Sequence, residues 1–157
     1  MRLLMVCLGN ICRSPLAEGA VRARLDAARL DWVRVDSAGT GGWHVGDPPD
    51  HRSVAVARRH GVDIATQRAR QLHGDDYHAF DWLLCADRSV LRDVQARAPA
   101  HAPARAALLL DWAGTAPGAE VPDPYTGGPE DFLAVWRMVD EAAEAIVARI
   151  AAAKPRG

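Results

Sequence analysis

The sequence has few cysteines, no long apolar segment and no excess of charge of either sign. Its three cysteines are an odd number and too few for a disulfide scaffold, which favours a reducing compartment and therefore the cytoplasm. No apolar run approaches the roughly 20 residues that span a bilayer, so no membrane association is expected. The first predicted strand begins almost at Met1, which leaves no room for a signal peptide.

Charge and ligand spacing exclude further classes of protein. The 19 basic residues nearly balance the 20 acidic ones, and a net charge of −1 predicts no general attraction to nucleic acid. The histidines and cysteines lack the spacing of metal ligands, so neither a metal nor another cofactor is expected. No Gly-Lys-Ser or Gly-Lys-Thr ends a Walker-type nucleotide loop. In the Gly-rich stretch that begins at Gly39, His44 stands where a dinucleotide fingerprint needs its third glycine.

What the sequence does contain is an alternation of apolar, strand-like segments with segments of helical spacing. We predict strands at residues 2–8, 32–36, 80–85 and 106–111, and helices at residues 15–30, 50–60, 88–97 and 130–153. A chain of 157 residues is long enough for a sizeable core, and no linker divides it. The alternation therefore predicts a single α/β domain over residues 1–157, built on a parallel sheet.

The most informative segment joins the first predicted strand to the first predicted helix and reads CLGNICRSP, from Cys7 to Pro15. Ligands of open parallel sheets bind at the carboxyl ends of the strands, where this loop is expected. Its backbone amides and the helix N-terminus behind it favour an anion. Gly9 and Asn10 are expected to adopt the left-handed conformations that a tightly curled loop requires. We therefore predict a phosphate-binding loop.

Three side chains of this loop indicate its chemistry. Cys7 is expected beside a helix N-terminus and a cation, which both favour the nucleophilic thiolate. Arg13, six positions later, carries a planar fork that matches two oxygens of a phosphoryl group. Ser14 can donate a hydrogen bond to the sulfur. Cys7 alone could equally be a packed core cysteine, but the combination predicts in-line attack on phosphorus and a cysteinyl-phosphate intermediate.

The segment from Cys7 to Pro15 resembles the active-site loop of the low-molecular-weight protein tyrosine phosphatases. The similarity continues in order through residues 36–40 (DSAGT), 43–46 (WHVG), 69–71 (ARQ), 87–89 (DRS) and 123–125 (DPY), and so covers nearly the whole chain. The resemblance implies a four-stranded parallel sheet flanked by helices on both faces. It also implies that the substrate is a phosphotyrosine-containing protein.

The resemblance also implies roles for individual residues. On sequence alone, Asp123 between its two prolines is better explained as a turn residue. The resemblance instead makes it the general acid, which protonates the leaving oxygen and later activates water. Trp43 and Tyr125 would flank the pocket mouth and hold an aromatic ring. The residues expected to bind substrate are Leu8, Gly9, Asn10, Ile11, Cys12, Ser14, Trp43 and Tyr125.

Cys12 adds a second thiol to the loop, five residues after Cys7. One interpretation is that it only fills space beneath the loop. The other is redox protection, because an oxidised Cys7 sulfur could be intercepted as a Cys7–Cys12 disulfide that a thiol reductant reopens. The second interpretation predicts a redox-regulated enzyme.

Residues outside the loop give weaker indications. Asp87 follows the third predicted strand and could brace Arg13 or cap the helix at residues 88–97, and both interpretations stay open. Cys85 lies in an apolar strand and is expected to be a packed core residue. The neighbouring Asp75 and Asp76 are interpreted as a solvated loop.

Two positions depart from the family pattern. Gln67 lies where many relatives have a histidine that supports the loop, so loop support here is a point to test. Thr126 replaces the second tyrosine that eukaryotic relatives carry after Asp-Pro-Tyr, which weakens any claim of regulation by tyrosine phosphorylation at this loop.

Three alternatives to a tyrosine phosphatase are considered. An arsenate reductase needs further cysteines to relay a disulfide, and only Cys85 lies outside the loop. A phosphoarginine phosphatase is associated in relatives with threonine at the position of Ile11, so isoleucine favours phosphotyrosine. A non-enzymatic phosphate-binding module would not need Cys7, Arg13 and Asp123 together. The sequence indicates neither the physiological substrate nor the oligomeric state.

Overall fold

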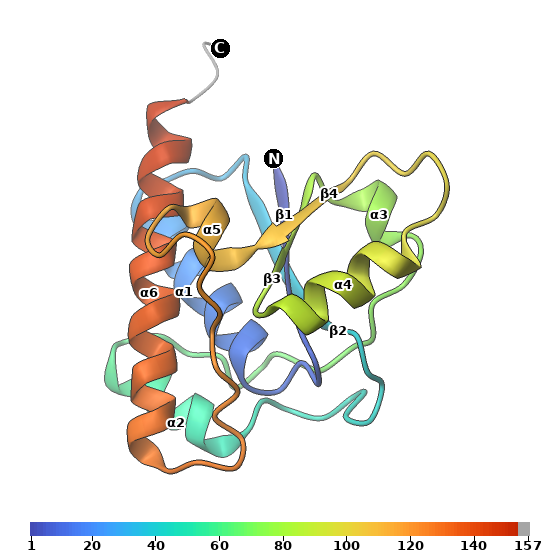
Figure 1. The fold of residues 1–157 in the computed structure, drawn as a ribbon. Helices are drawn as coiled ribbons and strands as arrows, with labels where there is room; N and C mark the ends of the chain where they lie inside the picture. Colours follow the sequence, from blue (N-terminus) through green and yellow to red (C-terminus); the bar gives the residue numbers. More distant parts are fainter. Residues whose placement is uncertain (154–157) are drawn as a thin grey trace.

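A computed structural model describes residues 1–153, which are built around a four-stranded parallel sheet (Figure 1). The strands lie in the order β2-β1-β3-β4, so β1 pairs with both β2 and β3. Their bounds are β1 Arg2–Cys7, β2 Arg34–Gly39, β3 Trp82–Cys85 and β4 Arg105–Leu108. The helices are α1 Arg13–Ala27, α2 His51–Arg59, α3 Asp76–Ala79, α4 Arg88–Arg97, α5 Leu109–Ala113 and α6 Pro129–Ala152. Residues 154–157 of the predicted domain lie outside the described part of the chain.

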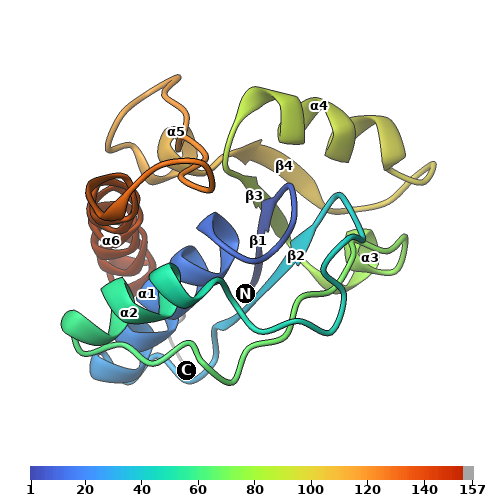
Figure 2. The same cartoon turned by 90° about the horizontal axis from the view of Figure 1, so that it is seen from below.

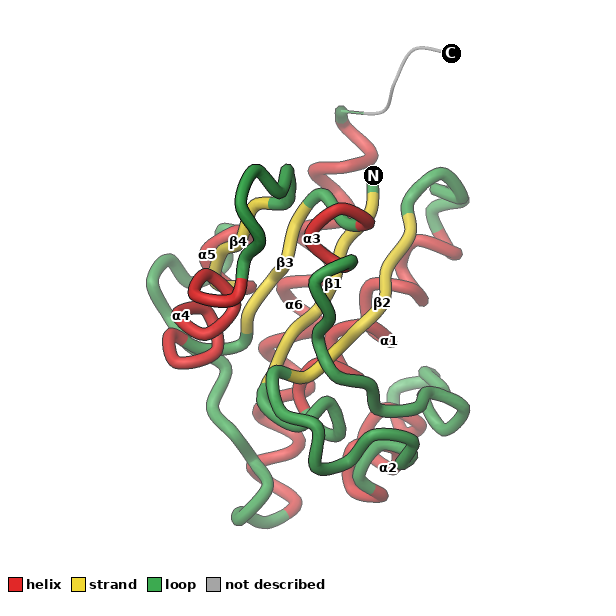
Figure 3. The backbone as a smooth tube through the Cα atoms, turned by 90° about the vertical axis from the view of Figure 1, so that its right-hand side faces the viewer, coloured by secondary structure: helices red, strands yellow, loops and turns green. Residues whose placement is uncertain are grey.

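Helices cover both faces of the sheet, as the resemblance implied. In Figures 1 and 2, α1, α2, α5 and α6 lie on one side of the strands, and α3 and α4 lie on the other. Helix α6 packs along α1 and also contacts α2 and α5, while α4 packs against β3 and β4. Figure 3 shows the strands running side by side between the two layers. Among residues 1–153, no helix has the length and apolarity needed to cross a membrane.

The side chains of β1 explain why both faces must be covered. Leu3 and Met5 belong to the core beneath α1 and α6, whereas Leu4 and Val6 belong to a second core beneath α4. All four side chains are buried. Successive residues of a strand point to opposite faces, so an apolar run without alternation produces a strand that is buried on both sides.

Local signals set the ends of several helices. Asp50 caps α2, because its carboxylate accepts a hydrogen bond from the Arg52 amide at 2.8 Å. Asp87 caps α4 in the same way, with the Val90 amide at 2.8 Å from its Oδ1. Pro129 begins α6, where its missing N–H costs nothing. The α4 bounds agree with the predicted helix at residues 88–97.

Two predicted strands need correction. The strand predicted at residues 106–111 ends at Leu108, and the chain continues as the short helix α5. A short apolar run does not distinguish a buried strand from a buried helix, which explains the error. The strand predicted at residues 32–36 is displaced, because β2 runs from Arg34 to Gly39 and so ends at the first residue of the Gly-rich stretch.

The prediction of a solvated loop is wrong for Asp76. This residue begins α3, is 7% exposed, and accepts hydrogen bonds at 3.0 Å from two nitrogens of Arg70. Arg70 also donates to Asp36 on β2. A carboxylate can be buried where a cation pairs with it, and the sequence did not identify Arg70 as that partner. Asp75 is exposed, as predicted.

Candidate active site

The loop between β1 and α1 lies at the carboxyl end of the sheet with its own amides unused. Within residues 1–153, the backbone amides of residues 8–12 donate no hydrogen bond to another backbone or side-chain group. The residues that follow β2 hold the loop from outside, because the amides of Thr40 and Gly41 donate to the carbonyls of Cys7 and Leu8 at 3.0 and 2.8 Å. Free amides next to the N-terminus of α1 form a site that suits an anion.

Close approach and backbone conformation fix the shape of the loop. Asn10 has a φ of 58°, in the left-handed region, as predicted. Gly9 is not among the residues with positive φ, so the expectation of a left-handed Gly9 is wrong. The glycine that the loop requires is Gly39, because the loop packs against it where a side chain would not fit. A Cβ there would lie 2.8 Å from the Leu8 carbonyl oxygen and 3.0 Å from the Asn10 amide nitrogen, so the Gly-rich segment is a wall of the loop.

The sulfur of Cys7 lies at the floor of the loop beside a positioned hydroxyl. Cys7 is 3% exposed, and its Sγ is 3.0 Å from the Oγ of Ser14. The same Oγ accepts a hydrogen bond from Asn10 Nδ2 at 2.7 Å. Because the serine oxygen already accepts from Asn10, its hydrogen is available to the sulfur. The Ser14 hydroxyl is therefore held in place to donate a hydrogen bond to the Cys7 sulfur.

A chain of buried polar groups supports Asn10 from below. The Nδ2 of Asn10 also donates to Ser37 Oγ at 3.0 Å, and Ser37 in turn donates to Glu18 Oε1 at 2.6 Å. Burial raises the pKa of Glu18, and hydrogen bonds from Ser37 and Arg22 partly offset that effect. Glu18 and Ser37 were not predicted, because they lie on α1 and β2 and meet only in the folded chain.

Arg13 is buried and braced on one side. Its Nη1 donates to Asp87 Oδ2 at 2.6 Å and to the carbonyl of Val121 at 3.0 Å. Burial raises the pKa of Asp87, but the hydrogen bonds from Arg13 and from the amides of Val90 and Ser89, together with the charge of Arg13, outweigh burial and hold that pKa below its usual range. Asp87 therefore braces Arg13 and caps α4 at once, so both open interpretations are correct. Since Nη1 is fully used, Nε and Nη2 remain for a ligand.

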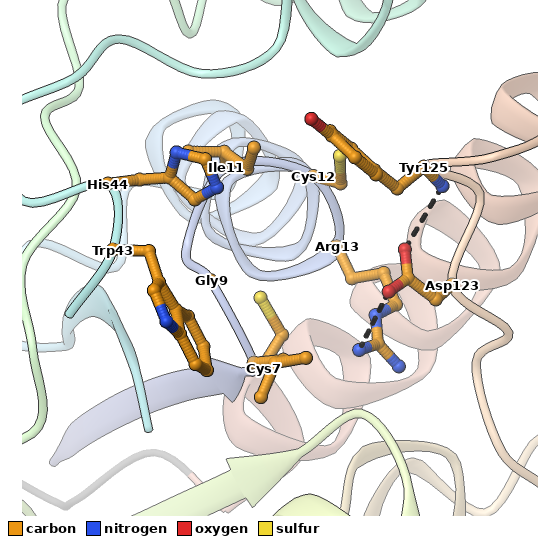
Figure 4. Close-up of a pocket in the computed structure, with 10 residues that line it drawn as sticks. Cys7, Gly9, Ile11, Cys12, Arg13, Trp43, His44, Asp123 and Tyr125 are labelled. Atoms are coloured by element: carbon orange, nitrogen blue, oxygen red, sulfur yellow. Dashed lines mark hydrogen bonds and ion pairs between the residues drawn. The ribbon is translucent and has the colours of Figure 1, made fainter. Parts of the chain in front are cut away.

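A cavity of about 200 Å³ opens above Cys7 (Figure 4). The carboxylate of Asp123 lies on its wall, with Oδ2 3.9 Å from Nη2 of Arg13 and Oδ1 accepting from the Tyr125 amide at 3.0 Å. Cys7 and Asp123 lie far apart in the sequence, and Figure 4 shows both at this one cavity. A nucleophile, a guanidinium and a carboxyl group therefore surround the same space.

Aromatic side chains form the rim of the cavity. Trp43 and Tyr125 stand on two sides of it in Figure 4 and are 72% and 50% exposed. His44 also lines the cavity, although sequence reasoning gave it no role, and its Cδ2 lies 3.2 Å from where a Cβ on Gly9 would be. A flat ring that enters the cavity would contact both aromatic residues.

Cys12 lies at the same cavity as Cys7, whereas Cys85 lies in the core on the other face of the sheet. Cys12 lines the cavity, and burial together with the charge of Asp50 raises its pKa to about 12. Cys85 is fully buried in the core beneath α4, as predicted, and burial raises its pKa to about 12 as well. Both side chains are therefore neutral thiols at physiological pH, and all three cysteines are free.

The structure brings nearly all of the predicted site residues to one cavity. Those that line it are Cys7, Leu8, Gly9, Ile11, Cys12, Arg13, Trp43, Asp123 and Tyr125. The side chains of Asn10 and Ser14 instead lie buried behind the loop and hold it in shape. Within residues 1–153, no three His, Cys, Asp or Glu side chains are grouped so that they could hold a metal ion.

Comparison with known proteins decides the family. The family described as low molecular weight phosphotyrosine protein phosphatase matches residues 2–156. The chain belongs to this family. The low molecular weight phosphotyrosine protein phosphatase of Schizosaccharomyces pombe is 38% identical over 134 residues, which cover 84% of this chain and 85% of that protein. The chain is therefore a low-molecular-weight protein-tyrosine phosphatase that acts on phosphoproteins.

Solved structures agree with this membership. The protein tyrosine phosphatase of Entamoeba histolytica superposes with a TM-score of 0.90 at 31% identity, over 99% of both chains. A Drosophila arginine phosphatase superposes with a TM-score of 0.88 at 28% identity, over 95% of this chain and 97% of that one. The same fold therefore also occurs in a protein that is named as an arginine phosphatase.

The two departures from the family pattern have distinct surroundings. Gln67 donates from Nε2 to the carbonyl of Pro15 at 3.1 Å, so it supports the first turn of α1 directly. Its Oε1 is buried without a hydrogen-bond partner in the described part of the chain. Thr126 is exposed next to Tyr125. Gln67 thus supports the helix that follows the loop, and within residues 1–153 its side chain forms no hydrogen bond with Asn10 or Ser14.

Proposed function

We propose that Cys7 is the nucleophile, Arg13 the phosphoryl-binding group and Asp123 the general acid in the hydrolysis of phosphotyrosine. One observation carries the proposal. The Cys7 sulfur, held at 3.0 Å from the Ser14 hydroxyl, lies at the floor of a cavity that Arg13 and Asp123 also line. If Cys7 were only a packed core residue, nothing would explain the unused loop amides around its sulfur or the carboxyl group across the cavity.

In the first half of the reaction, a new S–P bond forms as the P–O bond to tyrosine breaks. The loop amides and the free Nε and Nη2 edge of Arg13 bind the three non-bridging oxygens of the phosphoryl group, whose charge they stabilise in the transition state. Asp123 gives its proton to the leaving phenoxide, so tyrosine leaves neutral. The Ser14 hydroxyl stabilises the thiolate before attack.

In the second half, water breaks the S–P bond. Asp123, now a carboxylate, accepts a proton from the water that attacks phosphorus, and the thiolate of Cys7 is the leaving group. The hydrogen bond from Ser14 to the sulfur favours that departure. Phosphate is released and Asp123 is protonated again, so the cycle consumes one water and needs no cofactor.

The rim supports an aromatic substrate. Trp43 and Tyr125 flank the cavity, so a phosphotyrosine ring between them would place its phosphate at Cys7, whereas the short side chain of phosphoserine would not reach so far. Ile11, which lines the cavity, presents an apolar side chain without a hydrogen-bonding group. That surface favours a phenyl ring over the polar guanidinium of phosphoarginine.

An arsenate reductase is disfavoured by the position of Cys85. A disulfide relay needs a thiol that can reach Cys7, but Cys85 is fully buried in the core beneath α4, and Cys7 belongs to the core on the other face of the sheet. The sheet itself separates the two sulfurs. We therefore assign the hydrolytic reaction to the site.

We further propose one catalytic domain over the chain that works in the reducing cytoplasm. All secondary structure elements surround one sheet, which supports the single domain. Attack by Cys7 requires a reduced thiol, and three free cysteines, two of them on one loop, would be at risk of disulfide formation in an oxidising compartment.

The test uses a panel of phosphotyrosine, phosphoserine and phosphoarginine peptides with wild-type protein and Cys7→Ser. We expect phosphotyrosine to be hydrolysed at least about tenfold faster than the others and Cys7→Ser to be inactive while still binding inorganic phosphate, since the backbone amides are unchanged. Acid quenching during turnover should trap phosphate on Cys7. Retention of a tenth of the activity by Cys7→Ser would refute the mechanism, and a preference for phosphoarginine would refute the substrate.

A further inference from the structure

We propose that Arg52 is a positioning residue that holds the general-acid loop, residues 121–127, against the phosphate-binding loop. Arg52 lies in the first turn of α2 and does not line the cavity. No motif in the sequence marks it. The inference rests on the proposed function of Asp123, and its test separates the two.

Nearly every donor of the Arg52 guanidinium is engaged. Nε and Nη2 donate to the two carboxylate oxygens of Asp50, each at 3.0 Å. Nη2 also donates to the carbonyl of Tyr125 at 2.9 Å, and Nη1 donates to the carbonyl of Gly127 at 3.2 Å. The Cζ atom of the guanidinium lies over the ring of Phe132 on α6, 4.4 Å from the ring centroid. A planar fork can meet all of these groups at once, and the point charge of a lysine cannot.

The contacts of Arg52 connect the two loops of the site. The amide of Asp50 donates to the carbonyl of Ile11 in the phosphate-binding loop at 2.8 Å. The Asp50 carboxylate accepts a hydrogen bond from Arg52, and Arg52 also donates to the carbonyl of Tyr125. The general-acid loop is thus connected to the phosphate-binding loop through one carboxylate and one guanidinium.

Asp123 is therefore held from both sides. Two residues before it, the carbonyl of Val121 accepts from Arg13 at 3.0 Å. Two residues after it, the carbonyl of Tyr125 accepts from Arg52 at 2.9 Å. The Asp123 side chain itself is 49% exposed, and the guanidinium of Arg13 is 3.9 Å from its carboxylate, so packing does little to fix it. Its position over Cys7 depends on how the backbone on either side is anchored.

Loss of the hydrogen bond from Arg52 to the Tyr125 carbonyl should specifically weaken proton donation by Asp123. We expect Arg52→Met to lower kcat/KM for phosphotyrosine by roughly 10- to 100-fold, because a displacement of about 1 Å costs a catalytic group about that much. For nitrophenyl phosphate, whose leaving group needs the proton less, we expect a loss below about threefold. Met keeps an apolar side chain over Phe132 and removes the donors. Arg59→Met removes the same charge from an exposed position on α2 and serves as the matched control.

A double-mutant cycle gives the decisive readout. If Arg52 acts through Asp123, Arg52→Met should cost less than about twofold in an Asp123→Asn background, because the group it positions no longer donates a proton. Equal losses in both backgrounds, or equal losses for phosphotyrosine and nitrophenyl phosphate, would overturn the inference and leave Arg52 as a support of the fold alone. If Asp123→Asn itself lacked leaving-group dependence, the proposed acid would be wrong, which is a separate outcome.

Discussion

Substitution of Asp87 tests how Arg13 is kept in place, because this carboxylate both pairs with Arg13 at 2.6 Å and caps α4. The Arg13 side chain is 4% exposed and that of Asp87 is 23% exposed. Removal of one partner from a buried pair costs roughly 3–5 kcal/mol, and the partial exposure of Asp87 favours the lower end, about 3 kcal/mol. Loss of a helix cap adds about 1 kcal/mol. We expect Asp87→Ala to lose about 4 kcal/mol in the free energy of unfolding.

Asp87→Ser separates the two roles, since a serine hydroxyl still caps a helix but carries no charge. We expect it to lose about 3 kcal/mol, which corresponds to a decrease in Tm of roughly 6–12 °C for a protein of this size. Because the pKa of Asp87 is lower in the folded protein, its stabilisation is present above about pH 4 and is lost as the pH falls through the folded pKa.

Urea unfolding followed by circular dichroism, at neutral and at acidic pH, measures both effects. The difference between wild type and Asp87→Ser should be constant above about pH 5 and shrink in more acidic buffer. A loss within about 1 kcal/mol at neutral pH is what an exposed pair would give, and it would refute the claim that Arg13 depends on this partner.

Three further substitutions test the walls and floor of the cavity. Arg13→Lys should lose orders of magnitude in kcat, because an ammonium cannot bind two phosphoryl oxygens in the plane that Asp87 sets; near-normal turnover would exclude this role. Trp43→Ala should raise KM for phosphotyrosine peptides more than for small alkyl phosphates, and equal increases would mean that the ring does not contact substrate. Cys12→Ser should keep substantial activity but recover less than wild type after peroxide and thiol reductant, with a Cys7–Cys12 disulfide found by peptide mapping only in wild type; equal recovery would leave Cys12 as packing.

The sequence was most informative where chemistry and backbone conformation are set by neighbours in the chain. Cys7, Arg13 and Ser14 lie on one loop. The left-handed conformation of Asn10 reflects the intrinsic preference of asparagine. Asp123 was different, because an Asp between two prolines is ordinary in a turn, and only the resemblance gave it a role. Glu18 and Arg52 were not found at all. Their partners come from other elements, Ser37 on β2 for one and Tyr125 before α6 for the other, so no local pattern marks them.

The same limit explains the errors in the fold. The apolar residues before Asp111 suit a buried strand and a buried helix equally well, and contacts with α6 favour the helix α5. The prediction of a solvated loop fails at Asp76 because Arg70, although only six residues away, lies in a stretch without helical or strand spacing that would indicate the pairing. In both cases the deciding interaction depends on how the chain folds, and the local pattern of the sequence does not contain it.

The unused amides of residues 8–12 have a consequence for the design of inhibitors. A neutral, apolar compound that filled the cavity would displace water from these N–H groups without offering them acceptors. Each donor that is buried unpaired costs roughly 1–3 kcal/mol, which is comparable to the gain from burying an apolar side chain. Tight binding therefore requires a head group with several oxygens, and the remainder of the compound can gain affinity from the side chains that line the cavity, such as Ile11, Trp43 and His44.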